Sequence, residues 1–254
     1  MTAVHLVGGG RDESAVLPLF AAFVQDAGAD LAARPRIHVL LVLEPDDAES
    51  VDRFAGALRL AGADAVVHAI VEGEMFAPTA LAGADGVFIG GGLTPAYHAA
   101  MVRIAPILRE RVATGMPYLG FSAGAAIAAE RALIGGFRLG GVLVCDEDAG
   151  EELDELSVVA GLGLVPFSVE VHAVQWGTLS RLVAAVDAGL IASGFAIDEH
   201  TAVIWRGARD AGDVTIAGAG AAWHVERDAG SPTSPVGVTR RTDGQPRGGT
   251  SSIE

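Results

Sequence analysis

Short apolar runs alternate along the chain with longer stretches in which apolar residues recur every three to four positions. The short runs have the length and composition of buried strands. The longer stretches, such as residues 12–27 and the segment opened by Pro45, have the period of amphipathic helices. Strands that alternate with helices predict an α/β fold, in which a single doubly wound, mainly parallel sheet carries helices on both faces. The strands are expected at residues 3–7, 37–43, 65–70, 86–89 and 117–121.

The second half of the chain has shorter apolar runs and more glycine. A helical period returns in one place only, residues 176–186, which predict an amphipathic helix. The remaining runs read as extended segments, and the last two are expected to close the fold as antiparallel strands at the C-terminal edge of the sheet. These segments are residues 133–145 (a hairpin), 158–165, 169–172, 195–205 (a strand pair), 214–216 and 221–225.

From residue 228 onward Gly, Ser, Thr, Pro and Arg dominate the sequence. Such a composition offers little apolar surface to bury and predicts a flexible tail. The sequence therefore predicts one α/β domain at residues 1–227 and a tail at residues 228–254.

Composition excludes several classes of protein. The chain has 254 residues, half of them hydrophobic, but no apolar run approaches the ~20 residues of a membrane span. A net charge of −15 argues against nucleic acid and anionic membranes as partners. The only cysteine, Cys145, cannot form an internal disulfide, and residues 1–10 lack the basic region of a signal peptide, so a cytoplasmic protein is expected. Since every basic residue is Arg, a Schiff-base lysine, a Ser–Lys dyad and a Walker-type phosphate loop are excluded.

Ser122 lies where a predicted strand passes without a loop into an Ala-rich predicted helix, residues 123–129. A strand that enters a helix at one residue requires a sharp turn, and the small neighbours Gly120, Ala123 and Gly124 allow it. The run Gly-Phe-Ser-Ala-Gly at residues 120–124 matches the G-x-S-x-G nucleophile elbow in the required strand–turn–helix context. We therefore expect Ser122 to be a nucleophile, rather than a serine that only caps the helix.

Two glycine runs also follow predicted strands. Residues 8–10 fail the G-x-G-x-x-G pattern because Glu13 occupies its last position, so a tight turn near the site is expected there. In an elbow hydrolase one oxyanion donor is the N–H after the nucleophile, here Ala123, and the other comes from a neighbouring strand-end loop. Gly91 and Gly92 are the candidates for the second donor, because glycine lets the backbone approach a substrate closely.

The base and the acid that would serve Ser122 stay open from the pattern alone. His172, His200 and His224 each lie near carboxylates. His224 is the late histidine that the chain order of an α/β-hydrolase requires, but the pattern does not choose among the three. The acidic run at residues 146–155 is most simply a solvated loop.

Several motifs, in this order, resemble the cyanophycinase and dipeptidase E family of serine peptidases. They are Phe-Ile-Gly-Gly-Gly at residues 88–92, Gly-Phe-Ser-Ala-Gly-Ala at 120–125, Gly-Leu-Gly-Leu-Val-Pro at 161–166, His172, and Ala-Ile-Asp-Glu-His-Thr-Ala at 196–202.

The resemblance implies a class I glutamine amidotransferase-like fold and the catalytic residues Ser122, His172 and Glu199. It favours Glu199 over Asp198 because the family's acid is the second residue of its Asp-Glu-x-Thr-Ala segment. It implies no metal and no organic cofactor.

Three departures from the family's pattern concern substrate binding. Leu93 precedes Thr94 where the family usually has Asp-Gln or Asn-Thr, which leaves Thr94 as the candidate for substrate contact. The segment before His172 reads Val-Pro-Phe-Ser-Val-Glu-Val, closer to the dipeptidase E version than to cyanophycinases. The arginines usual after that histidine are absent, so Arg181 is the first basic residue available for a substrate carboxylate.

We therefore expect a serine exopeptidase-like hydrolase that cleaves a small peptide or isopeptide amide, of aspartyl or β-aspartyl type by resemblance. One alternative is an α/β-hydrolase-type esterase that uses His224; the other is a catalytically silent, amidotransferase-like binding protein. A homodimer is compatible with each of these, and the sequence does not decide the oligomeric state.

Overall fold

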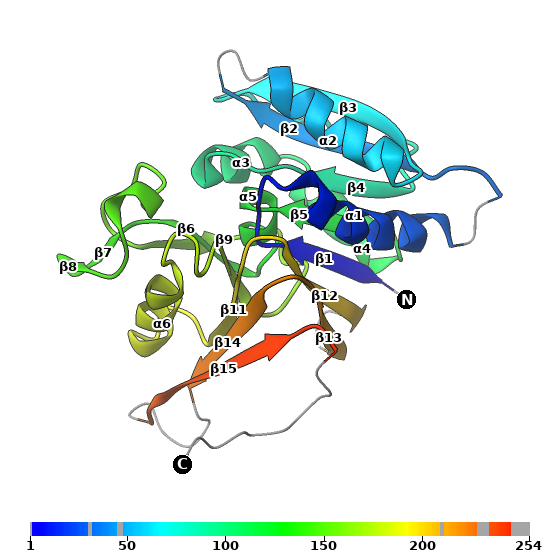
Figure 1. The fold of residues 1–254 in the computed structure, drawn as a ribbon. Coiled ribbons are helices and arrows are strands. Elements are labelled where there is room, and N and C mark those ends of the chain that lie inside the picture. Colours follow the sequence, from blue (N-terminus) through cyan, green and yellow to red (C-terminus); the bar gives the residue numbers. More distant parts are fainter. Residues whose placement is uncertain (1, 30–31, 45–47, 209–210, 228–233, 245–254) are drawn as a thin grey trace.

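The computed structural model describes residues 2–29, 32–44, 48–208, 211–227 and 234–244 (Figure 1). Within these residues the largest sheet has seven strands in the order β13-β12-β1-β5-β4-β2-β3. The strands from β1 to β3 in this order are parallel, and β12 and β13 continue the sheet antiparallel at one edge. The fold class expected from the sequence, α/β with a mainly parallel sheet and antiparallel edge strands, is confirmed. The strands are β1 (Ala3–Val7), β2 (Arg36–Leu43), β3 (Asp64–Val71), β4 (Gly86–Ile89), β5 (Tyr118–Phe121), β12 (Thr201–Ala208) and β13 (Ala211–Gly218).

Helices cover both faces of this sheet because alternate strand residues point to opposite sides. On β2, for example, Leu40 and Val42 belong to one apolar cluster, whereas Val39 and Leu41 belong to the other. Helices α1 (Glu13–Gly28) and α2 (Ala48–Leu60) cover the face of Val39. Helices α3 (Thr94–Met101), α4 (Ala105–Ala113) and α5 (Ala123–Ala126), with the short η1 (Pro78–Leu81), cover the face of Leu40.

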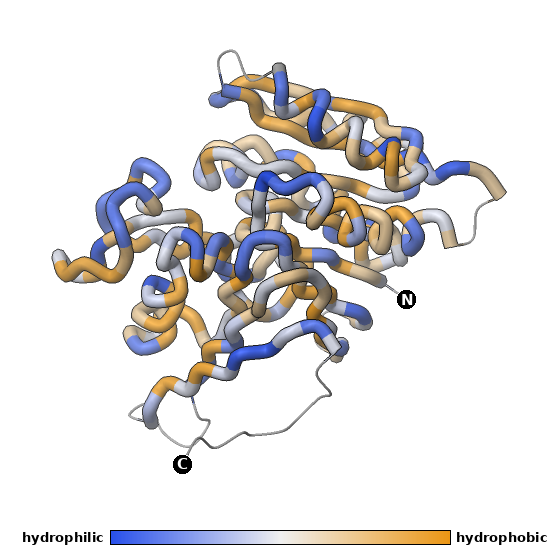
Figure 2. The backbone as a smooth tube through the Cα atoms, viewed as in Figure 1, coloured by the Kyte–Doolittle hydropathy of each residue, from blue (hydrophilic) through white to orange (hydrophobic). Residues whose placement is uncertain are grey.

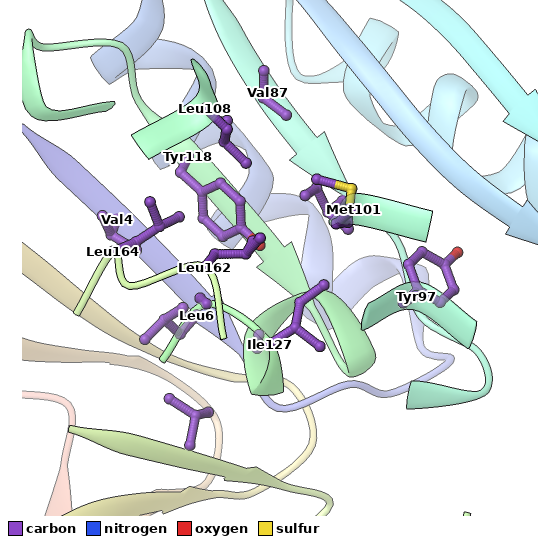
Figure 3. Packing of buried hydrophobic residues seen from close by; sticks show 14 of the residues in the cluster. Val4, Leu6, Val87, Tyr97, Met101, Leu108, Tyr118, Ile127, Leu162 and Leu164 are labelled. Atoms are coloured by element: carbon purple, nitrogen blue, oxygen red, sulfur yellow. The ribbon is translucent and has the colours of Figure 1, made fainter. Parts of the chain in front are cut away.

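The core on the α3–α5 face is built around Tyr118 of β5. Figure 3 shows its ring among side chains from β1, α4 and the segment 162–164. The ring is fully buried and its hydroxyl donates a hydrogen bond of 2.6 Å to the Gly124 carbonyl, which ties the core to the turn after Ser122. Hydrophobic residues follow the strands and the inner faces of the helices, and hydrophilic residues gather in the loops beyond the strand ends (Figure 2). None of the helices in the described part of the chain is long and apolar enough to span a membrane.

A second, four-stranded sheet has the order β10-β11-β14-β15. Its first two strands are parallel and the others are antiparallel, and α6 (Leu179–Asp187) packs on it through Leu182, Ala185 and Val186. Its strands are β10 (Ser168–Val171), β11 (Ser193–Ile197), β14 (Ala221–Arg227) and β15 (Val236–Thr242). Several short elements lie between α5 and β10 in the chain. They are β6 (Arg131–Gly135) paired with β9 (Ser157–Ala160), β7 (Arg138–Leu139) paired with β8 (Val142–Leu143), and η2 (Glu147–Ala149).

Two local expectations are wrong. Residues 195–205 do not form a strand pair, because β11 belongs to the second sheet and β12 to the central sheet, so residues 198–200 link the two sheets. The helix after Ser122 is a single turn rather than seven residues. It ends early because the carbonyls of Ile127, Ala128 and Ala129 accept hydrogen bonds from the backbone of residues 162–164 instead of from a next helical turn.

The expectation of a flexible tail is also wrong for part of the C-terminal segment. Residues 228–233 and 245–254 lie outside the described residues, but Val236–Thr242 forms β15 and pairs with the whole of β14. Composition misled here because β15 is paired through its backbone and leaves most of its side chains exposed.

Truncation after Arg227 is therefore expected to destabilise the protein. It would remove the backbone pairing of β15 and leave β14 as an open sheet edge. We expect the Tm to fall by roughly 5 °C or more, because a loss of 1 kcal/mol lowers the Tm of a chain this long by about 2–4 °C. Thermal unfolding of this variant should be compared with a chain that ends at Gly244 and keeps β15. Equal Tm values for the two chains would contradict the prediction.

Candidate active site

Ser122 directly follows β5 and directly precedes α5. Its backbone has φ 52° and ψ −112°, a conformation that L-residues rarely adopt and that is common at functional sites. Glycine is required on both sides: a Cβ on Gly120 would lie 2.3 Å from the Gly124 carbonyl oxygen, and one on Gly124 would lie 2.4 Å from the Ile89 oxygen. The sharp turn predicted from residues 120–124 is therefore present, with Ser122 at its apex.

His172 and Glu199 reach Ser122 from the second sheet. They follow β10 and β11, which are parallel neighbours, so both residues emerge at the same edge. The Oγ of Ser122 lies 2.8 Å from Nε2 of His172, and Nδ1 of His172 lies 2.8 Å from Oε1 of Glu199. The three side chains thus form one continuous hydrogen-bonded row.

The glycine run at residues 8–10 holds the two sheets together beneath this row. The carbonyls of Gly8 and Gly9 accept hydrogen bonds from the backbone N–H groups of His172 (3.0 Å) and His200 (2.9 Å). A Cβ on Gly9 would lie 2.2 Å from Cε1 of His172, so a side chain at this position would displace the imidazole. The run is a tight turn beside the site, as expected.

Asp198 points away from His172 and has a structural role. Its Oδ2 accepts a hydrogen bond of 2.9 Å from the N–H of Ala221, and its Oδ1 accepts one of 3.2 Å from Nε1 of Trp223. Glu199 is oriented separately, because its N–H donates to Oε1 of Gln175. Of the two adjacent acids, Glu199 contacts the imidazole.

Burial and an aromatic neighbour set the chemistry of His172. The ring stacks on Trp176, with 3.9 Å between the ring centroids and 7° between the planes. Burial lowers the pKa of His172 below its ordinary value, and the hydrogen bond to Glu199 offsets part of that effect. Near neutral pH the imidazole is therefore uncharged and able to accept a proton.

A cleft of about 1320 Å³ opens above Ser122, and it is lined by far more carboxylates than cations. Its arginines are Arg11 and Arg53. Its acidic residues are Asp12, Glu44, Glu49, Glu147, Asp148, Glu151, Glu152, Asp154 and Glu199. The acidic run at residues 146–155, which the sequence suggests is a solvated loop, thus contributes several residues to the wall of the cleft. In the described part of the chain no three His, Cys, Asp or Glu side chains are grouped so as to hold a metal ion.

The glycines expected to stabilise an oxyanion lie near Ser122. Gly91 and Gly92 line the cleft, and a Cβ on Gly91 would lie 2.8 Å from Cβ of Ser122. Ala123 follows Ser122 directly as the first residue of α5 and is fully buried.

The two residues expected to bind substrate are placed elsewhere. Arg181 is 3% exposed, and its guanidinium forms a bidentate ion pair with Glu170 at 2.7 and 2.9 Å. Its expected contact with a substrate carboxylate is therefore wrong. Thr94 is also 3% exposed and does not line the cleft, and its N–H donates a hydrogen bond to Glu151. The sequence could not reveal either arrangement because each depends on how separate elements pack: Glu170 lies on β10 and Arg181 on α6, and Thr94 bonds to a residue 57 positions later.

His224, the alternative base, lies on β14 and lines a separate cavity of about 430 Å³. It stands against Phe195 and 3.6 Å from Glu226. The geometry does not bring His224 to Ser122.

Sequence reasoning missed Trp176, Glu151 and Glu152 as residues of the cleft. Their signals were weak: a lone tryptophan after His172 and two members of an acidic run. His200, one of the three histidines left open as the base, also lines the cleft. His200 accepts a hydrogen bond of 3.1 Å from the N–H of Asp12 and so closes the cleft near α1.

Comparisons with solved structures agree with this fold. A peptidase from an acI-B1 Actinobacterium is similar over 96% of both chains, with a TM-score of 0.69 and 15% sequence identity. A putative peptidase E protein from Listeria monocytogenes EGD-e is similar over 86% of this chain and 99% of its own, with a TM-score of 0.57 and 18% identity. None of the curated proteins compared matches the sequence. The family model of peptidase family S51 matches residues 42–210, more than half of the chain, so this protein belongs to peptidase family S51 and is a serine peptidase.

Proposed function

We propose that this peptidase cleaves a small peptide or isopeptide amide, as an exopeptidase, through a triad of Ser122, His172 and Glu199. The observation that carries the proposal is the hydrogen-bonded row at the floor of the cleft, with 2.8 Å between Ser122 Oγ and His172 Nε2 and 2.8 Å between His172 Nδ1 and Glu199 Oε1. Both distances are within the reach that proton transfer requires.

In this mechanism the Ser122 hydroxyl attacks the scissile carbonyl carbon while His172 Nε2 takes its proton. The carboxylate of Glu199 accepts the Nδ1–H bond, which fixes the tautomer of the ring and stabilises the imidazolium that forms. Collapse of the tetrahedral intermediate breaks the C–N bond, and the imidazolium gives its proton to the departing amine. Water then repeats the cycle on the acyl-enzyme: His172 accepts a proton from it, and the ester to Ser122 is hydrolysed.

Backbone N–H groups of Gly91 or Gly92 and of Ala123 would hold the oxyanion. Such fixed donors stabilise the charge that develops on the carbonyl oxygen in the transition state. The close approach of Gly91 to Ser122 supports this assignment, because the oxyanion forms next to the nucleophile.

The resemblance implies an aspartyl or β-aspartyl substrate, and the charges of the cleft suggest what accompanies it. Arg181 is bound to Glu170 and does not line the cleft. Arg11 and Arg53 do line it, and they are the candidates for contact with a substrate carboxylate. The excess of carboxylates favours substrates that also carry a positive charge, because a cleft lined by one sign of charge concentrates the opposite sign. A free α-ammonium group, which an exopeptidase substrate carries, meets this condition.

A substrate panel combined with covalent labelling tests the proposal. Wild-type protein is incubated with Asp-X, β-Asp-X and other dipeptides, with N-acetylated versions of each, and with simple esters. A serine-directed fluorophosphonate is used in parallel, and the labelled residue is identified by mass spectrometry. We expect turnover of free dipeptides, loss of turnover on N-acetylation, and label on Ser122. Turnover of esters alone would support the esterase alternative, and no turnover of any compound would support a binding protein.

The pH dependence of the reaction follows from the environment of His172. Burial lowers the pKa of His172, so the neutral, proton-accepting form persists to a more acidic pH than for an exposed histidine. We expect kcat/KM to rise with pH along a single acidic limb whose midpoint lies below the ordinary histidine value of about 6.5. The limb should lie at a still lower pH in Glu199→Gln, because the lost carboxylate no longer favours the imidazolium. Measurement of kcat/KM between about pH 4 and 9 checks both points. A wild-type midpoint above about 6.5 would contradict the first expectation, and a midpoint in Glu199→Gln that is higher than in the wild type would contradict the second.

A further inference from the structure

Left-handed backbone conformations mark the cleft. Among the described residues, every non-glycine residue with a positive φ lines it, namely Ser122, Glu151, Glu152, His172 and His200. Such conformations are costly and persist where the surrounding structure holds them for a function. Two of the five, Glu151 and Glu152, belong to the acidic run and have no place in the triad.

Glu151 makes one specific contact with the nucleophile's surroundings. Its Oε2 accepts a hydrogen bond of 2.7 Å from the N–H of Thr94, 57 residues earlier in the chain. Thr94 is the first residue of α3, and Leu93 before it provides no side-chain cap. Glu151 therefore supplies the cap that the local sequence lacks. Burial raises the pKa of its carboxyl group, which is consistent with a side chain held inside the wall of the cleft.

The segment ahead of Thr94 is the glycine loop that runs from the end of β4 past Ser122. At its first residue, Gly90 donates a hydrogen bond to the Leu40 carbonyl and accepts one from the N–H of Gly124. At its far end, the contact with Glu151 fixes Thr94. Gly91 and Gly92 lie between these two anchors. Gly91 also accepts a hydrogen bond of 3.3 Å from the hydroxyl of Tyr97, which lies on α3, so the position of the loop depends on these three contacts.

The segment that carries Glu151 is held by a buried network. Nη1 of Arg181 donates hydrogen bonds to the carbonyls of Ala149 (2.5 Å) and Gly136 (3.2 Å), at the base of the acidic run. The same guanidinium is fixed by Glu170, which precedes His172 by two residues on the same strand end. The strand that precedes His172 is thus connected to the glycine loop through Arg181, the backbone of residues 149–151 and the side chain of Glu151.

We propose that Glu151 is a positioning residue for the oxyanion hole: its side chain reaches across the cleft wall to Thr94 and fixes the Gly91–Gly92 N–H groups against Ser122. The proposal rests on the function proposed above. It requires the length of the side chain and an acceptor oxygen, and it does not require the negative charge.

Two substitutions separate reach from charge. Glu151→Gln keeps the length and a carbonyl oxygen that accepts the Thr94 N–H, but it removes the charge. Glu151→Asp keeps the charge but withdraws the acceptor by one methylene. Asp tolerates a left-handed backbone at least as well as Glu, so Glu151→Asp adds no backbone strain. Glu155→Asp is the matched control, because Glu155 also belongs to the acidic run and accepts backbone N–H bonds, from Gly140 and Gly141, but does not line the cleft.

Steady-state kinetics on a dipeptide from the panel, together with the affinity for a peptidyl boronic acid, provide the readouts. The boronate bonds to the serine and places a negatively charged oxygen in the oxyanion hole, so its affinity reports on the hole. We expect Glu151→Asp to lower kcat by about 10–100-fold and to lower the affinity for the boronic acid by a similar factor, because small misplacements of catalytic groups have effects of this size. KM should change by less than a factor of about three, since the hole acts on the transition state. Glu151→Gln and Glu155→Asp should remain close to wild type in both readouts.

A charge-dependent role would reverse the order of the two variants, with Glu151→Gln impaired and Glu151→Asp active, and would overturn the proposal. Wild-type kinetics in Glu151→Asp would also overturn it. If Glu151→Asp proves too unstable to assay, a tenfold loss of boronate affinity in Glu151→Gln is sufficient to reject it. Failure of the proposed function is distinguishable, because in that case wild-type protein would neither turn over dipeptides nor take the fluorophosphonate on Ser122.

Discussion

Replacement of Ser122 by alanine is expected to abolish turnover while the protein keeps its fold. The substitution removes only Oγ, and no covalent acyl-enzyme can form without it. Removal of a triad member costs on the order of 10⁴-fold or more in kcat. The fold should tolerate the change because Ser122 does not cap α5 with its side chain, and the Cβ that packs near Gly91 remains.

The measurement is kcat on the best dipeptide of the panel, with circular dichroism and the Tm as checks on folding. Ser50→Ala is the matched control, because Ser50 also lines the cleft but lies on α2, away from the elbow. We expect its kcat to remain within a few-fold of wild type, and the fluorophosphonate to label it normally. Hydrolysis by Ser122→Ala at the wild-type rate would disprove the mechanism.

Glu199→Gln is expected to have the second largest effect, a loss of kcat on the order of 10³–10⁴-fold with little change in KM. An amide can accept the Nδ1–H bond or donate to the ring, so it no longer fixes the tautomer in which Nε2 faces Ser122. It also carries no charge to stabilise the imidazolium. KM should stay nearly constant because Glu199 acts on the imidazole, which reaches Ser122 at 2.8 Å.

The adjacent acid provides the control. Asp198→Asn leaves the contact between Glu199 and the imidazole in place and weakens the bonds of Asp198 to Ala221 and Trp223. We expect it to lower the free energy of unfolding by about 1–3 kcal/mol, the usual effect of a disturbed buried hydrogen bond, with kcat within about tenfold of wild type. The assignment of the acid would be wrong if Asp198→Asn eliminated catalysis while Glu199→Gln retained it.

The local sequence is sufficient to predict a part of the site that is formed by a single short stretch of the chain. The turn at Ser122 needs only Gly120 and Gly124 close by, and both are visible as a motif. The strands β1 and β4 have the bounds expected from their apolar runs, because a strand buried on both faces is continuously apolar.

The partners of Ser122 needed information from beyond the local pattern. Three histidines lie near carboxylates in the sequence, and it was the resemblance that chose His172 and Glu199. The geometry of the fold explains why these two meet Ser122: β10 and β11 are parallel neighbours in the second sheet, so the residues that follow them emerge together. His224 lies on β14, which runs antiparallel to β11.

The sequence by itself determined the α/β class, the parallel strands and the elbow at Ser122, because each depends on hydrophobic period or on glycine within a few residues. Only the tertiary structure decided that Arg181 pairs with Glu170, that Glu151 caps α3, and that β15 completes a second sheet. These features depend on contacts between separate elements of the fold. An Arg, a Glu or a short polar segment has the same local pattern whether it faces solvent or a buried partner. The physical reason is that burial and pairing, which fix the role of a charged residue, are properties of the packed fold and not of the residue or its neighbours.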